Sequence, residues 1–380
     1  MKTFVTIFEK CENIHLIKDV GQIPYFMHKI FQYDSIILTV KNDKYYPYLE
    51  SEVKGLKLKF IPKIKLGRVS LSVIWYLIKY SKGIDVLHLF HHREPSYVYS
   101  IIYKFMNPKG HLYLKSDKGY RGLLKNDGLF ANKKLRHKIR SKLFDISIKY
   151  IDTLSIESIN GYKFLVSKYP DYKEKFLYLT NGLDIDGFYN QIPLLDYDKK
   201  ENLIITVGRI GAKEKNNSML LNAISKIDLN DWKVLFIGPI EESFKNDIDN
   251  FYKINPSLIN KVIFTGAIYD RKILLEFYAK SKIFCLTSIE ESFGFVLIEA
   301  MSYGNYIVTT DVSSAREITE DEKYGRIVED DIGLANTLND LILNSDKYDK
   351  LSIDIANYTN KKYNWKQVVT LLETHINTNE

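Results

Sequence analysis

The chain has 380 residues, 45% of them hydrophobic and 27% charged, with a formal net charge of +7. This length suits two domains of fewer than ~200 residues each, and the composition is that of an ordinary soluble protein. No apolar run approaches the roughly 18 residues that a membrane-spanning helix needs. Near the N-terminus, Glu9, Lys10 and Glu12 interrupt the first apolar run before a signal-peptide core forms. We therefore expect a first buried strand there.

The cysteines indicate the cellular compartment of the protein, and the charge distribution indicates the kind of surface that it binds. Cys11 and Cys285 lie far apart inside or beside apolar runs, which predicts two reduced, structural thiols in a cytoplasmic protein. Residues 1–190 hold 32 Lys and Arg against 18 Asp and Glu, a net charge of +14, whereas residues 191–380 hold 22 against 29, a net charge of −7. The basic half predicts contact with an anionic surface, either nucleic acid or a membrane.

The strongest local candidate for this contact is a basic amphipathic pattern at residues 133–149. Leu135, Ile139, Leu143 and Ile146 recur at helical spacing, and lysines and arginines fill the remaining faces. Such a helix either packs on the core with solvated lysines or attaches peripherally to the inner membrane leaflet, where each basic residue adds about 1 kcal/mol. Nucleic acid fits less well, because the chain contains nothing like a recognition module or an aromatic stacking platform.

Apolar runs alternate with helical patterns along the whole chain. In the first half, predicted strands span residues 4–8, 35–40, 86–90, 111–115, 153–156 and 177–179, with helical patterns at 23–31 and 69–80. In the second half, predicted strands span residues 203–207, 234–237, 262–264, 283–286 and 307–309. This alternation predicts an α/β fold of parallel sheets wrapped by helices.

The pattern divides into two Rossmann-like, doubly wound domains. We expect an N-terminal domain at residues 1–186, an irregular linker at 187–200, a C-terminal domain at 201–361, and a helix at 362–380 that packs back toward the first domain. Ligands of such folds bind outside the carboxyl ends of the strands, here in a cleft between the domains.

In chain order, the first candidate site residue is Gly21. It lies in a predicted loop, residues 15–24, between the first strand and a helix that Pro24 begins. A glycine there either lets the backbone approach a ligand or makes a plain turn.

Three histidines follow at the end of the strand at residues 86–90. They are His88, His91 and His92, and they lack the carboxylate or cysteine motif of a metal site, so we expect no metal. Lys115 at the end of the next predicted strand, and Asp117 just after it, face an acceptor or are structural.

The second half contributes a pair of cations. Arg209 follows the strand at 203–207, and Lys215 lies in the loop before a predicted helix at 218–224, with Lys213 as the alternative cation. A strand-end arginine and a loop lysine can clamp a diphosphate.

The most informative segment is Glu-Ser-Phe-Gly-Phe-Val-Leu-Ile-Glu, which Glu291 and Glu299 bracket. It connects two apolar runs as strand, loop, helix and strand. Gly294 at the start of the helix leaves unpaired N–H groups and the positive end of the helix dipole facing an anion, so phosphate is the expected ligand. The residues expected at this anion site are Phe293, Gly294, Phe295 and Val296.

Residues 291–304 resemble the Glu-x7-Glu motif of retaining glycosyltransferases of the GT-B fold, in particular family 4. The specific motifs cover most of residues 200–330, and only loose ones cover residues 1–190. The resemblance implies transfer of a sugar from a nucleotide-sugar, with a UDP-sugar favoured, to an acceptor hydroxyl with retention at the anomeric carbon. It implies no cofactor and no metal. With the basic charge, it favours a lipid-linked saccharide of bacterial surface polysaccharide synthesis as acceptor.

The resemblance also implies roles for single residues. Arg209 and Lys215 would hold the leaving diphosphate, Glu291 would bind sugar hydroxyls, Glu299 would bind the ribose, and His91 would contact the transferred sugar. In the same way, the backbone at Gly266 and Ile268 would pair with the nucleobase, and Gly21 would face the donor phosphates, although the usual Gly-Gly pair is absent.

Two other functional classes remain open. A GT-B epimerase or phosphorylase would share the fold and would release free sugar or sugar phosphate without an acceptor. A catalytically dead module that binds a membrane surface would keep the basic N-terminal half and lose the chemistry.

Overall fold

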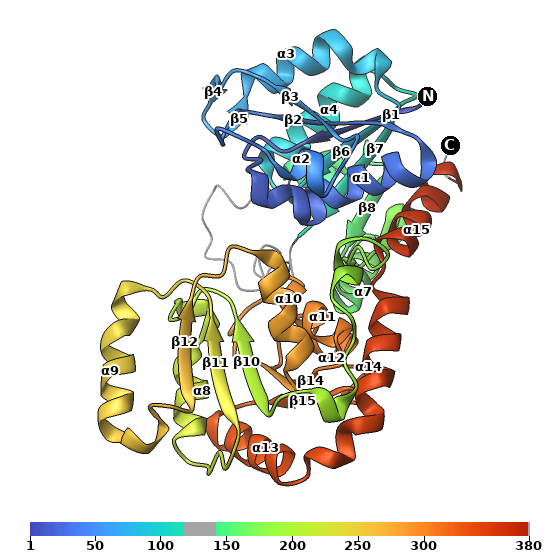
Figure 1. Cartoon of the computed structure of the whole chain (residues 1–380). Helices are drawn as coiled ribbons and strands as arrows, with labels where there is room; N and C mark the ends of the chain where they lie inside the picture. The colour runs from blue at the N-terminus through green and yellow to red at the C-terminus, as the bar shows by residue number, and fades with distance from the viewer. Residues whose placement is uncertain (118–122, 124–141, 379–380) are drawn as a thin grey trace. The chain divides into compact units, whose positions relative to one another are not determined.

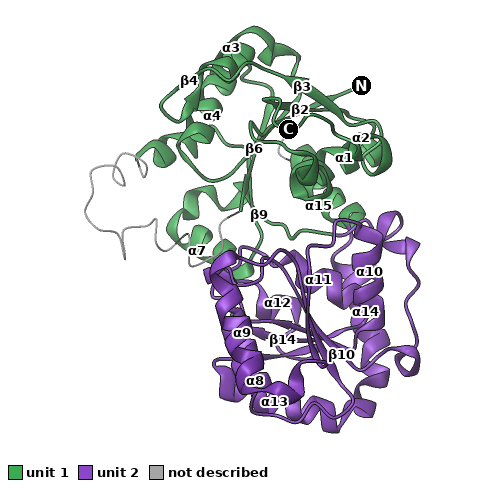
Figure 2. Ribbon diagram, turned by 60° about the vertical axis from the view of Figure 1, so that its left-hand side comes forward, with its two compact units in different colours: residues 1–182, 365–380 green, residues 183–364 purple. Residues whose placement is uncertain are grey.

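The structure is a computed structural model that describes residues 1–117, 123 and 142–378 (Figure 1). The chain forms two compact units, coloured separately in Figure 2. Unit 1 comprises Met1–Gly182 together with Trp365–Glu380, and unit 2 comprises Leu183–Asn364.

Unit 1 is built on a parallel sheet whose seven described strands have the order β3-β2-β1-β6-β7-β8-β9. Its strands are β1 (Thr3–Ile7), β2 (Asp34–Thr39), β3 (Lys57–Phe60), β6 (Val86–Phe90), β7 (His111–Ser116), β8 (Thr153–Ile156) and β9 (Phe176–Tyr178). Every residue of β6, β7 and β8 is buried, as expected for central strands that helices cover on both faces.

Six α-helices are described in unit 1, and four of them pack together as two pairs. They are α1 (Asp19–Phe31), α2 (Tyr48–Ser51), α3 (Leu71–Tyr80), α4 (Glu94–Met106), α7 (Ile159–Lys168) and α15 (Trp365–Thr378). The C-terminal helix α15 packs against α1, and α3 packs against α4. A short antiparallel hairpin of β4 (Lys65–Leu66) and β5 (Val69–Ser70) joins β3 to α3.

Unit 2 contains a second parallel sheet with the order β12-β11-β10-β13-β14-β15. Its strands are β10 (Leu203–Val207), β11 (Lys233–Ile237), β12 (Val262–Gly266), β13 (Ile283–Leu286), β14 (Tyr306–Thr310) and β15 (Gly325–Val328). Its helices are α8 (Asn217–Ile224), α9 (Lys245–Ile254), α10 (Arg271–Lys280), α11 (Phe295–Ser302), α12 (Ala315–Ile318), α13 (Asp331–Leu343) and α14 (Asp349–Lys362).

Both sheets reverse their strand order once. In unit 1 the chain winds from β1 to β3 in one direction and from β6 to β9 in the other, so the switch lies between β1 and β6. In unit 2 the switch lies between β10 and β13. Open α/β sheets bind ligands at this point, outside the carboxyl ends of the two strands.

The unit boundaries differ from the predicted domain bounds. The division falls after Gly182 and after Asn364, and the predicted linker at residues 187–200 is part of unit 2. Its last residue, Lys200, is buried, and its ammonium donates to the carbonyl oxygens of Ala279, Ser281 and Tyr303 at 2.7–3.1 Å. The polar residues that suggested a linker therefore include a lysine whose N–H donors are accepted by three backbone carbonyls inside the unit, where burial lowers its pKa to about 7.

Candidate active site

Two loops meet at the switch point of unit 2, one after β10 and one after β13. The N–H of Ile289 donates to the carbonyl oxygen of Glu214 at 2.8 Å, and the Thr287 hydroxyl donates to the carbonyl oxygen of Lys215 at 3.1 Å. These bonds tie together the two segments on which the sequence placed the anion clamp and the carboxylate motif.

At this junction, Lys215 and Glu291 form an ion pair with an Nζ to Oε1 distance of 2.5 Å. The Ser288 hydroxyl donates to the same carboxylate oxygen at 2.7 Å. The side chains of Lys215 and Glu291 are 19% and 16% exposed, so the pair is partly desolvated yet open to solvent. Ser288 was missed by the sequence analysis, and its only signal is a hydroxyl directly after an apolar strand, three residues before Glu291.

Arg209 lies in the same loop as Lys215 but has different partners. Its guanidinium pairs with Glu214 and approaches Glu241 at 3.7 Å, and its side chain is 60% exposed. Exposed ion pairs of this kind contribute little, so an incoming anion can replace them at small cost. Lys213, the alternative cation, is exposed.

Gly294 precedes α11 with φ of 84°, a left-handed conformation that glycine adopts without strain. The helix follows at once from Phe295, so its first amides lie beside the loop of Glu291. Phe293 is buried, and its carbonyl oxygen accepts a bond from the Ser314 hydroxyl, whereas Phe295 and Val296 are half-buried against the core. The loop thus fixes the orientation of a helix N-terminus, the end that attracts anions.

Glu299 lies one turn further along α11 and accepts two phenol hydrogen bonds. Tyr189 donates to Oε1 at 2.7 Å, and Tyr278 donates to Oε2 at 3.1 Å. Burial and the charge of Glu299 raise the pKa of both tyrosines, so both remain protonated donors. The sequence analysis missed both tyrosines. Tyr189 falls in the predicted linker, where nothing in the local pattern distinguishes it.

The backbone after β11 and β12 approaches the β10 loop closely. A Cβ on Gly238 would lie 1.8 Å from the carbonyl oxygen of Gly208, and the Gly238 N–H donates to the Gly266 carbonyl oxygen at 3.0 Å. Gly266 has open space where a Cβ would be, and Ile268 packs partly buried against the core. The space beside Gly266 is therefore open, which is compatible with a ligand lying against the backbone there.

In unit 1, the three histidines separate into two environments. His88 is fully buried, stacks on Tyr113 with ring centroids 4.4 Å apart, and bonds to the Thr6 hydroxyl. His92 is buried against Phe144. Both belong to the core of unit 1.

His91 instead lies at the carboxyl end of β6 with its ring half-buried. Its backbone has φ of 68°, which is uncommon for a residue with a side chain, and its N–H donates to the carbonyl oxygen of Lys115 at 3.0 Å. Its Nδ1 lies 2.6 Å from Oδ2 of Asp117. Burial is the largest single influence and disfavours the Asp117 carboxylate, but the hydrogen bond and charge of His91, a backbone hydrogen bond and the charge of Lys115 together outweigh it and lower the pKa of Asp117.

Beneath this pair lies a buried charge cluster. Lys115 pairs with Glu157 and lies 3.4 Å from Asp19, and Asn181 donates to Glu157 at 3.0 Å. Burial disfavours the Lys115 charge, but the carboxylates of Glu157 and Asp19 outweigh burial, so its pKa is raised. Burial also raises the pKa of Glu157, against the attraction of Lys115. The sequence offered Lys115 as a possible acceptor-side residue and gave no sign of Glu157.

Gly21 is a correction to the sequence analysis. The helix begins at Asp19 and contains Pro24, so Gly21 lies in the first turn of α1 rather than in a loop. Its N–H donates to the carbonyl oxygen of Lys18 at 3.0 Å, and a Cβ on Gly21 would lie 2.1 Å from the Leu16 carbonyl oxygen. The glycine therefore permits close packing of the helix start on the preceding turn, and that side of it offers no open approach to a ligand.

Four further expectations concern the cysteines, a metal site, the basic helix and a membrane-spanning helix. Cys11 and Cys285 are free, buried thiols whose pKa values burial raises to about 12. Within residues 1–117, 123 and 142–378, no group of three or more His, Cys, Asp or Glu side chains is arranged to hold a metal ion. Most of the predicted basic helix at 133–149, residues 133–141, lies outside the described residues. No helix among those described is long and apolar enough to cross a membrane.

Comparison with known proteins covers mainly the second half of the chain. Residues 191–358 match the family model described as glycosyl transferases group 1, and this span contains Arg209, Lys215, Glu291 and Glu299. A Campylobacter jejuni protein named GalNAc-alpha-(1->4)-GalNAc-alpha-(1->3)-diNAcBac-PP-undecaprenol alpha-1,4-N-acetyl-D-galactosaminyltransferase is 29% identical over 58% of this chain and 59% of its own length. A phosphatidyl-myo-inositol mannosyltransferase of Mycolicibacterium smegmatis is 27% identical over 52% of this chain and 51% of its own length. The chain thus matches between half and three fifths of these relatives.

Solved structures resemble the whole chain. A glycosyltransferase from Rickettsia africae covers 100% of this chain and 99% of its own with a TM-score of 0.75 at 17% identity. Anabaena HepE in complex with UDP covers 100% of both chains with a TM-score of 0.74 at 14% identity. The likeness confirms the GT-B fold with its two Rossmann-like domains. The family model and the named relatives support a glycosyltransferase.

Proposed function

We propose that the protein is a retaining glycosyltransferase that uses a nucleotide-sugar, with a UDP-sugar favoured, and needs no metal. The observation that supports this most directly is the Lys215–Glu291 pair beside the N-terminus of α11, at the switch point of unit 2. A cation, a carboxylate and free helix amides together suit a ligand that has both phosphates and hydroxyls. The structural likeness to a protein crystallised with UDP adds support for the uridine nucleotide.

In this proposal the protein stabilises charge rather than forming a covalent intermediate. The bond from the anomeric carbon to the diphosphate oxygen breaks, the bond to the acceptor oxygen forms on the same face, and a phosphate oxygen takes the acceptor proton. Lys215, Arg209 and the amides that follow Gly294 would bind the departing diphosphate. One preorganised donor of this kind is worth about 10²–10³ in rate.

The carboxylates would orient the donor. Glu291 would exchange its bond from Ser288 or Lys215 for bonds from sugar hydroxyls as Lys215 turns to the phosphates. Glu299, held by two phenols, would accept bonds from the ribose. The backbone at Gly266 and Ile268 would lie against the base.

For the acceptor, we propose a lipid-linked saccharide of surface polysaccharide synthesis, reached by a protein peripheral to the inner face of the membrane. Both relatives named above have a lipid in their names, undecaprenol diphosphate in one and phosphatidylinositol in the other. The basic N-terminal half matches an anionic membrane in charge. In unit 1 the half-buried His91–Asp117 pair is the group best placed to contact sugar hydroxyls.

Thermal shifts with free nucleotides test whether the protein binds a nucleotide-sugar donor. Thermal unfolding is measured with UDP, GDP and ADP in turn, in EDTA and then with magnesium. A ligand at about 100 times its dissociation constant adds roughly 2.7 kcal/mol, which raises the Tm by about 2–4 °C for a protein of this size. We expect a shift with UDP in EDTA that magnesium does not increase. A shift that appears only with magnesium would contradict metal independence.

Three lysine variants locate the binding site. Lys215→Ala should remove the UDP shift, whereas Lys233→Ala should keep it, because Lys233 is exposed at the first residue of β11, the opposite edge of the sheet. Lys213→Ala decides between the two loop lysines, and we expect it to keep most of the shift. If Lys213→Ala lost the Tm shift with UDP and Lys215→Ala kept it, Lys213 would be the lysine that binds the diphosphate.

Product analysis separates the other two functional classes. With a UDP-sugar and no acceptor, an epimerase or phosphorylase would release free sugar or sugar phosphate, and the proposed enzyme would form neither. A dead membrane-binding module would bind vesicles but show no nucleotide shift. Labelled sugar in an extracted lipid fraction, dependent on the added donor, is the expected positive result.

A further inference from the structure

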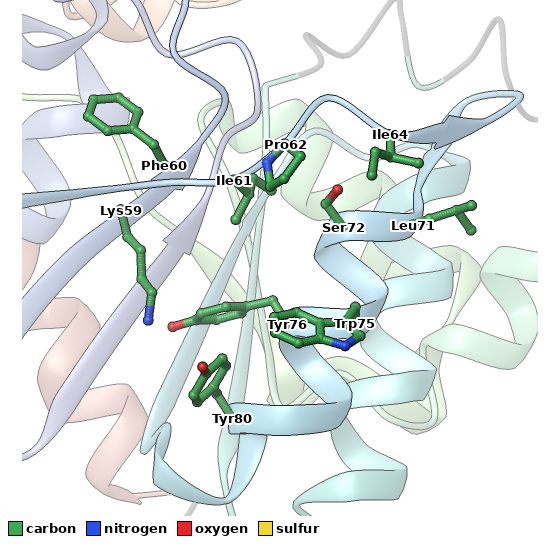
Figure 3. A pocket seen from close by; sticks show the side chains of 10 residues that line it. All are labelled: Lys59, Phe60, Ile61, Pro62, Ile64, Leu71, Ser72, Trp75, Tyr76 and Tyr80. Carbon is green, nitrogen blue, oxygen red and sulfur yellow. The ribbon is translucent and has the colours of Figure 1, made fainter.

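A pocket of about 420 Å³ lies in unit 1 between the edge strand β3 and helix α3 (Figure 3). Its wall is formed mainly by apolar side chains from β3, from the loop after it, and from α3. They include Phe60, Pro62, Ile64, Leu71 and Trp75. None of the candidate active-site residues described above lines it.

The pocket exists because α3 has two apolar faces. One face, with Val73, Tyr76 and Leu77, is buried in the core of unit 1. Leu71, Trp75 and Ile78 follow at intervals of four and three residues, which places them on one side of the helix, and all three are exposed. Trp75 is 59% exposed. A helix of a water-soluble protein normally has polar residues on such a face.

The chain beside α3 extends the same surface. The β4–β5 hairpin turns at Gly67 and presents Leu66, which is 72% exposed, and the N–H of Leu71 donates to the carbonyl oxygen of Ile64 at 2.9 Å. Phe60 and Ile64 are also exposed. Of these exposed apolar side chains, Phe60, Ile64, Leu71 and Trp75 line the same pocket, and apolar patches of this kind mark interaction sites.

Positive charge surrounds this apolar surface. Residues 53–84 include seven lysines and Arg68 but no Asp or Glu. Lys57, Lys65 and Arg68 pair with Asp34, Glu9 and Glu94, acidic residues from elsewhere in unit 1.

Other lysines of this segment lie over the aromatic rings instead. The ammonium of Lys59 is 4.6 Å from the centroid of Tyr80, and that of Lys79 is 4.9 Å from the centroid of Trp75. Their hydrocarbon stems cover apolar surface while their charges stay at its edge.

We propose that this pocket and its lysine rim bind an anionic membrane surface, with one hydrocarbon chain of a lipid in the pocket. Tryptophan, tyrosine and lysine beside apolar side chains are the residues that anchor proteins at the boundary between lipid head groups and chains. The positive rim complements anionic head groups, and the mainly apolar lining of the pocket complements a chain. The site gives a location to the membrane contact in the proposed function and rests on that part of it, but vesicle binding requires neither donor nor acceptor and so tests the site independently of sugar transfer. The site is separate from the segment at 133–149.

The fluorescence of Trp75 reports directly on contact between the pocket and a membrane. The chain has three tryptophans, all within the described residues, and Trp232 and Trp365 are buried. We expect the full-length protein to sediment with vesicles of phosphatidylcholine and phosphatidylglycerol, less with phosphatidylcholine alone, and less at high salt. Its emission should shift to shorter wavelength on binding, and lipids brominated in the acyl chain should quench it.

Variants locate the contact. Trp75→Gln should weaken binding about tenfold or more because an apolar anchor is lost, and Lys79→Gln should weaken it about fivefold. The matched controls Ile254→Gln and Lys253→Gln change an exposed apolar residue and a lysine on α9 of unit 2, and they should bind like the parent. All four sites are exposed, so the fold should persist, and an unchanged Tm confirms that it does.

Each contrary result overturns the proposal. Anionic vesicles that bind the protein without changing or quenching Trp75 emission would place the membrane contact elsewhere, for example at residues 133–149. No sedimentation even at low salt would exclude a lipid surface and leave a protein partner for this patch. A UDP shift retained in either case would show that the failure concerns this site alone and not the proposed transfer.

Discussion

The two sheets both gather charged side chains at their carboxyl edges, but they use them differently. In unit 1, Lys115 and Glu157 are almost completely buried and compensate each other, with Asp19 and Asn181 completing the cluster. In unit 2, Lys215 and Glu291 form the same kind of pair but keep 19% and 16% of their side chains exposed. The first pair is closed to solvent and the second remains accessible to a ligand.

This difference has an energetic consequence. Charges that are fully desolvated depend on each other, because either one alone would be very unfavourable in the interior. Charges at a surface keep part of their hydration and can change partners at small cost. A buried pair should therefore determine stability, and an accessible pair should determine binding and turnover.

The largest effect should follow from breaking the pair in unit 1. Glu157→Gln leaves Lys115 with only Asp19 at 3.4 Å, and we expect a loss of about 3 kcal/mol in the free energy of unfolding. Hydrogen exchange of the β7 and β8 amides, which are central to unit 1, measures this change without interference from unit 2.

A surface pair of the same unit provides the control. Asp34→Asn breaks the bond to Lys57, whose side chain is 60% exposed, and should cost less than about 1 kcal/mol. Equal costs for Glu157→Gln and Asp34→Asn would show that the Lys115 cluster is hydrated, and the contrast between the two units would fail.

The equivalent change in unit 2 should affect rate rather than stability. Glu291→Gln keeps the shape of the side chain but removes the charge that pairs with Lys215, so we expect kcat to fall about 10²–10³-fold with the Tm nearly unchanged. The assay is transfer of labelled sugar from the donor identified by the nucleotide shifts. Glu290→Gln, at the exposed neighbouring position, should retain most of the activity. A Tm loss in Glu291→Gln as large as that in Glu157→Gln would make the unit 2 pair structural.

The sequence predicted the sheets better than their edges. The predicted central strands appear in the structure within a residue or two, because runs such as Val-Leu-His-Leu-Phe are buried on both faces and apolar at nearly every position. Two of the four edge strands were missed, β3, Lys-Leu-Lys-Phe, and β15, Gly-Arg-Ile-Val, whereas the edge strands β9 and β12 were predicted. An edge strand is partly exposed to solvent and can carry charged residues, so its amino-acid composition can resemble that of a loop.

Sites were predictable where the chemistry is local. Glu291, Gly294 and Glu299 lie within nine consecutive residues, so the loop and helix that hold them could be inferred from the string itself. Tyr189 and Tyr278 could not, because they reach Glu299 from segments 110 and 21 residues away. Glu157 likewise meets Lys115 only through the pairing of β7 with β8. Such partners depend on strand order, which a single sequence does not display.

The smallest predicted effect is a loss of stability at acid pH. It should be larger in unit 1 than in unit 2, because the two units differ in their histidines. All eight histidines lie in residues assigned to unit 1, and unit 2 has none. Burial, and next the charge of Lys115, lower the pKa of His88 well below 6.5, and the aromatic neighbours Tyr113, Phe4 and Phe90 enclose it with the Thr6 hydroxyl. The unfolded chain therefore binds a proton near pH 6.5 that the folded chain does not.

The sign of the pH dependence follows from this difference. The stability that neutral His88 contributes is present above pH 6.5 and falls by up to about 1.4 kcal/mol for each pH unit below it. His15 and His375, whose pKa values burial also lowers, add to the same trend. Hydrogen exchange between pH 6.5 and 5 should show unit 1 weakening relative to unit 2, and His88→Gln should reduce the slope by about one proton. If the β10 and β11 amides lost protection as steeply as those of β6 and β7, the acid sensitivity would arise from carboxylates shared by both units, and the histidines of unit 1 would not be its cause.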